Sequence, residues 1–260
     1  MAELEYSVAD GVATILLNRP ERKNAFTLDM VDDWAAAVRS AQIDDDVRVL
    51  VLAGAGDAFC SGVDLEHFKS ESRGPLQEKE LLTKRVHAVA RAMADLSKPA
   101  IAAVRGVAVG AGMDMSLMCD IRIAGRSARF SEGYVRVGLV PGDGGCYYLP
   151  RIIGVANALR LLWTGEFVSA DEALALGLVS EVHDDATVMD ATYALARTIA
   201  ARAPLAVETI KRSVYQGLDH DLGTALDSIS SHQAVILSTD DSKEAFTAFR
   251  ERREPVFRRR

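Results

Sequence analysis

The stretch "GLVPGDGGCYYLP" at residues 138–150 holds an acidic residue, Asp143, inside a glycine-rich turn. One use of this aspartate is to cap the helix predicted to begin after it, because aspartate is a favoured N-cap residue. The other use is to take or give a proton at a substrate, as positioned carboxylates do in general acid–base catalysis. The neighbouring residues leave both interpretations open.

A second acid, Asp114, lies in "GAGMDMSLMCD" among Met113, Met115 and Met118. Helical spacing puts it on the same face as Ala111. Burial among apolar side chains disfavours the charged carboxylate and raises its pKa, which suits proton transfer near neutral pH. The alternative is a structural carboxylate that backbone N–H groups or an arginine satisfy.

Two glycine-containing turns, "FCSGVDL" and "GVAVGAGMD", follow apolar strands. Glycine allows the backbone to turn its N–H groups outward. Two N–H groups that converge on one point form an oxyanion hole, which stabilises an enolate or a tetrahedral oxyanion. A helix beginning near Gly112 would direct its positive end to the same point. Both segments also fit ordinary tight turns.

Other signatures of catalysis or metal binding do not occur. Neither "GAGDAF" nor "GAGMDM" has the third glycine of G-x-G-x-x-G, so we do not expect a dinucleotide fold. The five histidines, at positions 67, 87, 183, 220 and 232, are scattered, and we expect each to be a surface or capping residue. We therefore expect no metal.

Composition narrows the class of protein further. The chain has 30 basic and 37 acidic residues and a net charge of −7, which argues against nucleic acid as a partner. Its cysteines, Cys60, Cys119 and Cys146, are odd in number and have no C-x-x-C spacing, as in a reducing compartment. No signal peptide and no apolar stretch long enough to span a bilayer is evident. We expect a cytoplasmic protein without a membrane partner.

The elements that position these residues can be read from local patterns. Asp10-Gly11 between "EYSV" and "VATILLN" predicts a β-hairpin, and Thr27 predicts the cap of a helix. A further helix is expected around residues 77–97, ended by Pro99. The strands "VRVLVLAG", "AIAAVRG" and "DIRIAG" each lead into a turn, a short strand and a helix, which predicts stacked ββα units.

The later part of the chain is predicted to be mostly helical. "SADE" at 169–172 is a capping box, "LVSEVH" gives one more strand, and the helices after it break at Pro204, at Gly217 and near Ser238. Their apolar faces must pack on the core or on another subunit. We predict a core over residues 1–198 and a helical C-terminal segment over 199–260.

Six collinear motifs carry a resemblance over nearly the whole chain. They are "LNRPERKNAF", "AFCSGVDL", "KPAIAAVRGVAVGAGMDMSLMCDIRIA", "GLVPGDGG", "GLVSEV" and "AFTAFRERREPVF". In order and spacing the chain resembles the crotonase, or enoyl-CoA hydratase/isomerase, superfamily. The resemblance implies an α/β crotonase/ClpP-like fold, a spiral of ββα units with a helical C-terminal trimerisation segment. It also implies an acyl-CoA thioester substrate, whose enolate is held by two backbone N–H groups.

The resemblance also implies site residues. The oxyanion hole falls on Val63 and Ala111. The CoA-binding positions are Lys23, Ala25, Ser61, Gly62, Asp64, Leu65, Phe249 and Arg252. The last two match tail positions that approach the adenine and its phosphate, often across a subunit boundary. This gives the arginine-rich tail a purpose, whereas Arg258–Arg260 fit a solvated terminus.

The acid residues depart from the family pattern. Hydratases that this chain resembles hold a water between two glutamates, but the matching positions here are Asp114 and Tyr134. Glu132 is a candidate acid that would need a shifted register. Tyr134 could donate a hydrogen bond or shape the acyl pocket. Family members that isomerise dienes or displace a substituent have an aspartate opposite Gly142, one residue before Asp143.

These observations predict an acyl-CoA enzyme of the enoyl-CoA hydratase/isomerase type with aspartate acid/base residues. The alternatives are a double-bond isomerase of enoyl- or dienoyl-CoA without hydration, another acyl-CoA hydrolase or lyase, and a non-catalytic acyl-CoA binder. CoA enters as part of the substrate, so no separate cofactor is expected. The resemblance implies a homotrimer or a hexamer made of two trimers.

Overall fold

The computed structural model describes residues 2–64, 66 and 74–260 of the chain. Within these residues a central six-stranded sheet has the order β1-β2-β3-β4-β6-β9, and only its β1–β2 pair is antiparallel. A smaller sheet has the order β5-β7-β8. The strands are β1 (Leu4–Ala9), β2 (Val12–Leu17), β3 (Val49–Gly54), β4 (Ala100–Val104), β5 (Val107–Val109), β6 (Ile121–Gly125), β7 (Arg129–Ser131), β8 (Val168–Ser169) and β9 (Glu181–His183).

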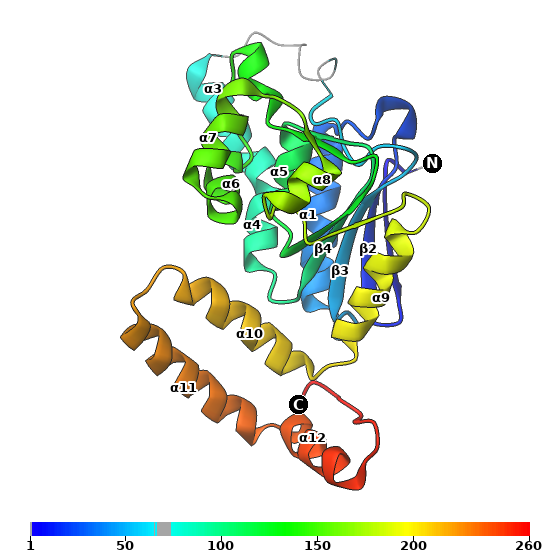
Figure 1. Cartoon of the computed structure of the whole chain (residues 1–260), viewed down its shortest axis with the longest axis vertical. Helices are drawn as coiled ribbons and strands as arrows, with labels where there is room; N and C mark the ends of the chain where they lie inside the picture. Colours follow the sequence, from blue (N-terminus) through cyan, green and yellow to red (C-terminus); the bar gives the residue numbers. More distant parts are fainter. Residues whose placement is uncertain (1, 65, 67–73) are drawn as a thin grey trace.

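Helices surround the central sheet and continue beyond it (Figure 1). Short irregular helices are η1 (Pro20–Arg22), the π-helix η2 (Leu82–Val86) and η3 (Gly133–Val137). The α-helices are α1 (Leu28–Ile43), α3 (Pro75–Leu81), α4 (His87–Asp95), α5 (Ala111–Leu117), α6 (Gly145–Ile153), α7 (Val155–Thr164), α8 (Ala170–Ala175), α9 (Val188–Ala200), α10 (Pro204–Gly217), α11 (Leu222–Ser238) and α12 (Asp240–Glu251). Among the described residues, no helix has the length and apolar character that a membrane span requires.

Strand β3 shows why the sheet is apolar on both faces. Leu50 and Leu52 belong to the larger core, which includes residues of α1 and α4. The alternate residues, Val49 and Val51, belong to a second core with residues of α9. Figure 1 shows α9 and α1 on opposite faces of the strands. Because both faces are covered, a continuous apolar run is favoured over polar–apolar alternation.

Several local predictions are confirmed. Asp10 and Gly11 have φ values of 53° and 76° between the antiparallel strands β1 and β2, as a tight hairpin requires. The Thr27 side chain caps α1 by accepting a hydrogen bond of 3.2 Å from the Met30 N–H. The order β4-β5-α5 and β6-β7-η3-α6 follows the predicted ββα units.

Two local predictions are wrong in detail. The segment after β3 in which a short strand was expected, described up to Asp64, forms only two isolated bridges, Phe26–Val63 and Cys60–Ala108. It pairs with two different neighbours for one residue each, so no ladder can grow. The helix expected around residues 77–97 begins at Pro75, a residue suited to the first helical turn. A π-helical segment at Leu82–Val86 then divides it.

The C-terminal helices α10, α11 and α12 project from the core (Figure 1). The predicted boundary at 198/199 falls within the last turn of α9, which ends at Ala200. Pro204 then begins α10. Helix α11 has no buried residue in the single chain.

The backbone of the last residues is anchored, while Arg258 and Arg260 remain exposed, as expected of a solvated terminus. Arg259 departs from that expectation, because it is half-buried and its side chain is paired. The backbone N–H groups of Arg258 and Arg259 donate to the Asp241 carboxylate at 2.7 and 2.9 Å. The Arg259 guanidinium pairs with Glu208 at 3.1 Å and also with Asp45. These contacts tie the tail to α10, to α12 and to the loop after α1.

Candidate active site

The two glycine-containing turns lie against each other. A Cβ added to Gly62 would be 3.6 Å from the Ala111 nitrogen. Phe26 bonds through its N–H and C=O to Gly62 and Asp64, both at 2.9 Å, so Val63 between them directs its own N–H away from Phe26. Ala111 is the first residue of α5, and its N–H precedes the hydrogen bonds of the helix. Neither N–H donates to a backbone carbonyl among the described residues.

The start of α5 depends on glycine at two positions. Gly110 has a φ of 52°, which favours glycine, and a Cβ there would contact the Tyr134 ring at 3.7 Å. A Cβ on Gly112 would collide with the Cys60 carbonyl. The two turns therefore need glycine at these positions to approach each other closely. This approach places the Val63 and Ala111 backbones near each other.

Four titratable residues meet beside these turns, and we name Asp114, Glu132, Tyr134 and Asp143 the acid cluster. The Tyr134 hydroxyl lies 2.7 Å from Asp114 Oδ2 and 2.9 Å from Asp143 Oδ2. A phenol carries one proton, so Tyr134 can donate to only one of the two carboxyl groups at a time. The other contact is a hydrogen bond only when that carboxyl group is protonated and donates to the phenolic oxygen.

The acid cluster is withdrawn from solvent. Asp114 and Glu132 are 0% exposed and Asp143 is 4% exposed. Burial raises the pKa of Asp114 to about 7, although the Tyr134 hydrogen bond opposes this shift. Burial also raises the pKa of Asp143, with opposition from Tyr134 and His87. The pKa of Glu132 is raised well above its ordinary value by burial and then by the nearby Asp114 charge.

The structure excludes one of the two interpretations of Asp143. Helix α6 has Gly144 as its N-cap residue, with a φ of 120° and no side-chain capping bond. The capping interpretation is therefore wrong. The Asp143 carboxyl instead accepts from Tyr134 through Oδ2, and its Oδ1 is buried without a hydrogen-bond partner among the described residues.

One residue near Asp143 could not be recognised from the sequence. The His87 ring nitrogen Nε2 lies 2.7 Å from the Gly142 carbonyl oxygen, so that nitrogen carries the proton and donates it. His87 is half-buried at the junction of η2 and α4, and it is neither the surface nor the capping residue that we expected. It belongs to no motif, and no group of metal-ligating side chains is found among the described residues.

Glu132 also lies closer to Asp114 than its register in the sequence suggests. A Cβ on Gly145 would collide with Asp114 Oδ1 and would lie 2.9 Å from both Glu132 oxygens. Because Gly145 has no side chain, the carboxyl groups of Asp114 and Glu132 can meet in the space beside its Cα. Glu132 directly precedes the 3-10 helix η3, and Tyr134 is the second residue of that helix. Both reach Asp114 without a shift of register.

Several predicted CoA-binding residues lie beside the first turn. Lys23 has a φ of 50°, and its carbonyl accepts a hydrogen bond of 2.9 Å from the Ser61 N–H. The Ser61 hydroxyl donates to the Arg22 carbonyl at 3.3 Å. The structure therefore brings Lys23, Ser61 and Gly62 together at the edge of the Val63 turn.

Two other predicted positions already have structural partners. Arg19 donates to the Ala25 carbonyl at 2.7 Å and pairs with the Asp64 carboxylate at 2.9 Å. Asp64 is therefore charge-balanced within the fold. Leu65, also predicted to bind CoA, lies outside the described residues.

The tail positions lie far from the acid cluster of the same chain. Phe249 is 84% exposed on α12, and Arg252 ends that helix with a φ of 55°. Figure 1 shows α12 at the opposite end of the molecule from α5 and α6. Within one chain, Phe249 and Arg252 do not reach the site.

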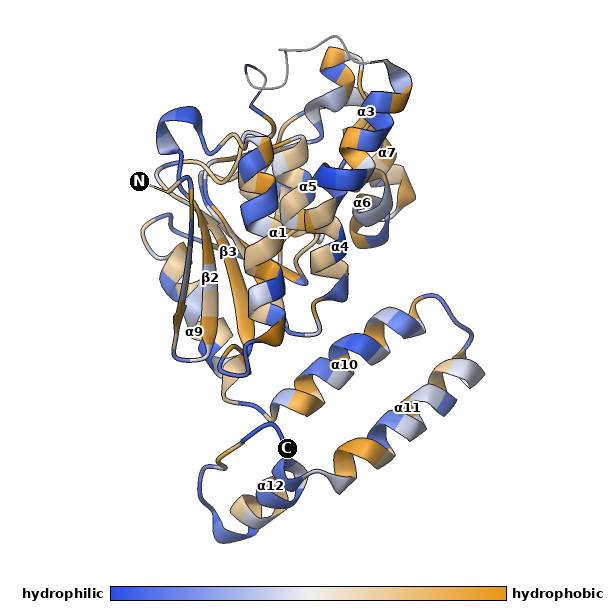
Figure 2. Ribbon diagram, turned by 180° about the vertical axis from the view of Figure 1, so that it is seen from behind, coloured by the Kyte–Doolittle hydropathy of each residue, from blue (hydrophilic) through white to orange (hydrophobic). Residues whose placement is uncertain are grey.

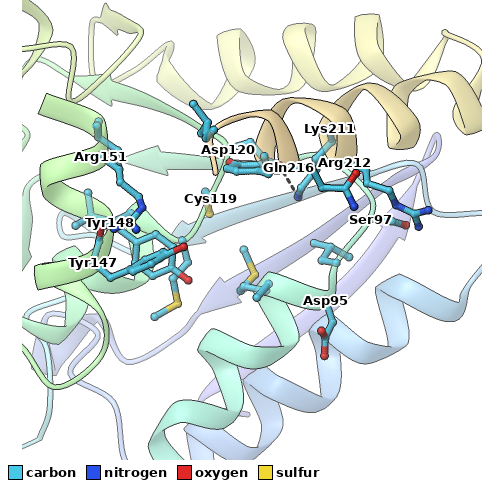
Figure 3. A pocket seen from close by; sticks show the side chains of 18 of the residues that line it. Asp95, Ser97, Cys119, Asp120, Tyr147, Tyr148, Arg151, Lys211, Arg212 and Gln216 are labelled. Atoms are coloured by element: carbon cyan, nitrogen blue, oxygen red, sulfur yellow. Dashed lines mark hydrogen bonds and ion pairs between the residues drawn. The ribbon is translucent and has the colours of Figure 1, made fainter. Parts of the chain in front are cut away.

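A cavity of about 520 Å³ lies between α10 and the core (Figure 3). Asp120 joins its two sides, because it bonds to Lys211 and to the Tyr215 hydroxyl, each at 2.8 Å. No residue of the acid cluster is among the described residues that line it. This cavity lies where α10 packs against the core, and it is separate from the acid cluster.

The ββα fold, with a cluster of buried carboxyl groups beside two backbone turns that lie against each other, defines the class of an α/β protein with a candidate enzyme site. A family model for enoyl-CoA hydratase/isomerase matches residues 7–260, so the chain belongs to the enoyl-CoA hydratase/isomerase family. It is an acyl-CoA enzyme of that type, and its fold is the crotonase fold.

Individual relatives are similar over the full length. The chain is 37% identical to 1,2-epoxyphenylacetyl-CoA isomerase of Escherichia coli (strain K12), covering 96% of each protein. It is 38% identical to (E)-benzylidenesuccinyl-CoA hydratase of Thauera aromatica, covering 96% of this chain and 97% of that protein. A crystal structure of enoyl-CoA hydratase from Bacillus anthracis has a TM-score of 0.94 at 31% identity, with full coverage of both chains. Isomerases and hydratases therefore both occur among its relatives.

Proposed function

We propose that the protein is a double-bond isomerase of an enoyl-CoA thioester that works through an enolate. The observation that carries this proposal is the Tyr134 hydroxyl between Asp114 Oδ2 and Asp143 Oδ2, at 2.7 and 2.9 Å. Hydration needs a water held between two carboxyl groups. Here a side-chain hydroxyl occupies the position between them, whereas proton transfer from carbon to carbon needs no added water.

The oxyanion hole of the proposal consists of the Val63 and Ala111 N–H groups. Two observations support this assignment: the two turns pack closely against each other, and the Val63 N–H points away from Phe26. Two such donors stabilise negative charge on a thioester oxygen more strongly in a dry site than in water. This lowers the cost of removing a proton from the neighbouring carbon.

Asp143 is the proposed base. Its Oδ1 is buried and has no hydrogen-bond partner among the described residues, and a substrate C–H group is the proposed partner of this atom. The carboxylate takes the proton of the substrate's α-carbon, and the electron pair of that bond forms the enolate. A proton then returns at the γ-carbon as the double bond moves next to the thioester. No atom is gained or lost overall.

The CoA portion of the substrate is proposed to lie along the Val63 turn, where Lys23, Ala25, Ser61 and Gly62 present mostly backbone groups. Asp64 supports this edge through Arg19. The proposal requires no metal and no cofactor other than the CoA of the substrate.

We propose further that the protein is a homotrimer or a dimer of trimers. Figure 2 shows apolar residues along α10 and α11, and several of them are exposed in the single chain. They are Ile210, Val214, Leu218, Leu222, Leu226, Ile229, Val235 and Leu237. Large exposed apolar patches mark protein–protein contacts. In such an assembly Phe249 and Arg252 of one subunit would approach the CoA bound to its neighbour.

The experiment that tests the reaction is mass spectrometry of 2-enoyl-, 3-enoyl- and dienoyl-CoA after incubation with the protein in deuterated water. We expect deuterium in the product without the mass of an added water. The Asp143→Asn variant should lose this exchange. Asp33→Asn, which changes an exposed aspartate on α1, is the matched control and should keep it.

Other outcomes would overturn the isomerase proposal. A product heavier by one whole heavy water would identify a hydratase. Release of free CoA would identify a hydrolase. No change in any substrate, with CoA-ester binding retained, would identify a binder or another acyl-CoA reaction.

A further inference from the structure

We propose that Glu132 is a neutral carboxylic acid that donates its proton to Asp114 Oδ1, and that it begins a chain of donors running through Asp114 and Tyr134 to Asp143. Glu132 is then a positioning residue that acts through Asp114 and does not touch the substrate. The proposal rests on the proposed function only where it takes Asp143 as the base.

The carboxyl groups of Glu132 and Asp114 meet around Gly145. Both Glu132 oxygens and Asp114 Oδ1 surround the position that a Gly145 side chain would occupy, with the Glu132 oxygens 2.9 Å from it. All three oxygens are buried, and both Glu132 oxygens lack a hydrogen-bond donor among the described residues. The Gly145 N–H acts on the Asp114 carboxyl and lowers its pKa. Two ionised carboxylates would repel each other here, and the Glu132 carboxylate would lack a hydrogen-bond donor. One proton between them removes both costs.

The hydrogen bonds within the acid cluster need more protons than Tyr134 supplies. The contacts Glu132–Asp114, Asp114–Tyr134 and Tyr134–Asp143 are three links between four groups. Each link needs one proton, and Tyr134 supplies only one. Two of the three carboxyl groups are therefore protonated when all the links are made, so the acid cluster carries one negative charge.

The single negative charge of the acid cluster lies on Asp143. Glu132 and Asp114 are fully buried, whereas Asp143 has a small exposure and lies near His87, which favours its charged form. With the charge on Asp143, the donors follow one direction: Glu132 to Asp114, Asp114 to Tyr134, and Tyr134 to Asp143. This direction leaves Asp143 Oδ1 as the free basic atom.

The groups that face Glu132 from other elements favour its neutral form. They are Asp114 on α5, Asp143 in the turn before α6, and Cys146 on α6. Each raises the pKa of Glu132, in addition to its burial. Tyr134, on η3 beside Glu132, has its hydroxyl in contact with both aspartates and donates to one of them at a time.

Infrared spectroscopy tests the protonation state without any substrate. At pH 8 the spectrum should contain a carboxylic-acid C=O band that shifts when glutamate is labelled with ¹³C at its side-chain carboxyl. The band should be absent from Glu132→Gln and retained in Glu254→Gln, a matched change of an exposed glutamate. No glutamate-sensitive band in the labelled wild-type protein would overturn the proposal, and this result needs no variant to fold.

Enzyme kinetics test the role in positioning. Glu132→Met removes the donor and should lower kcat/KM by about tenfold, because a buried carboxyl oxygen is left without its partner. Glu132→Gln supplies an N–H donor from the same position and should recover most of that loss. Equal losses in both variants, with melting temperatures close to the wild type, would overturn the donor role. The infrared result stays valid whichever reaction the enzyme catalyses, so it separates this proposal from the proposed isomerisation.

Discussion

The hydroxyl group of Tyr134 lies 2.9 Å from Oδ2 of Asp143, in a cluster whose three carboxyl groups are buried. This contact joins the aspartate of the glycine-rich turn to the 3-10 helix η3, and through the same hydroxyl to Asp114 on α5. Three separate elements thus meet at one oxygen atom. A proton shift at any of the three groups changes which hydrogen bonds the other two can form.

The first prediction concerns that oxygen atom. Tyr134→Phe keeps the ring but removes the hydroxyl group, so both aspartates lose a hydrogen bond. We expect kcat/KM for isomerisation to fall by about 10- to 100-fold, the range of a lost acid–base contribution. Deuterium exchange measured by mass spectrometry gives the rate. Tyr147→Phe, on the exposed side of α6, is the control and should keep its activity. An unchanged rate in Tyr134→Phe would contradict the bridging role.

The second prediction concerns stability as a function of pH. The Asp114 pKa is about 7 in the folded protein against 3.8 for the ordinary side chain, chiefly because of burial. The folded state therefore holds this proton more tightly than the unfolded state, and the free energy of unfolding decreases as pH rises from about 4 to 7. Asp114→Asn cannot ionise, so it escapes this loss.

The free energy of unfolding of Asp114→Asn minus that of the wild type should increase from pH 5 to pH 8. We expect this increase to be on the order of 2 kcal/mol. Urea denaturation at the two pH values measures the difference. The exposed Asp33→Asn control should follow the wild type at both. A difference that is the same at pH 5 and pH 8 would show that Asp114 does not titrate in this range.

Local patterns predicted much of the scaffold from the sequence. The Asp10-Gly11 turn and the Thr27 cap involve residues close together in the chain, so their chemistry is visible in a few letters. The breaks at Pro204 and Gly217 likewise mark the two ends of α10. The short strand expected after β3 does not form, because the two residues that bridge there, Cys60 and Val63, pair with different neighbours.

The site was harder to predict, because it depends on contacts between distant residues. Glu132 and Asp114 meet only because Gly145, on a third element, has no side chain. His87 reaches the Gly142 carbonyl across 55 residues of sequence. The resemblance directed attention to Asp114 and Asp143, but it gave no sign that Tyr134 connects them.

The third prediction uses that glycine. Gly145→Ala introduces a Cβ that would collide with Asp114 Oδ1 and crowd both Glu132 oxygens. We expect a loss of about 1–3 kcal/mol in the free energy of unfolding, as for other overpacked sites, together with a loss of isomerase activity. Gly217→Ala, at the end of α10 with no atom within 4 Å of the added Cβ, is the matched control. A Gly145→Ala protein with wild-type stability and activity would show that the two carboxyl groups have room to separate.

The fourth prediction concerns the proposed assembly. Phe249 and Arg252 are remote from the acid cluster of their own chain, so in a trimer they would serve a neighbouring site. Arg252→Ala should therefore raise KM for an acyl-CoA, because it removes a charged partner of the CoA phosphate, while Asp143→Asn should abolish turnover.

After unfolding and refolding together, the two variants would form mixed assemblies. In these, sites with Asp143 intact would receive Arg252 from the Asp143→Asn subunit, and activity at low substrate should exceed that of either variant alone. Light scattering of the wild type should give the mass of three or six chains. Strictly additive activity after co-refolding, or a monomeric wild type, would mean that the tail does not act across a subunit boundary.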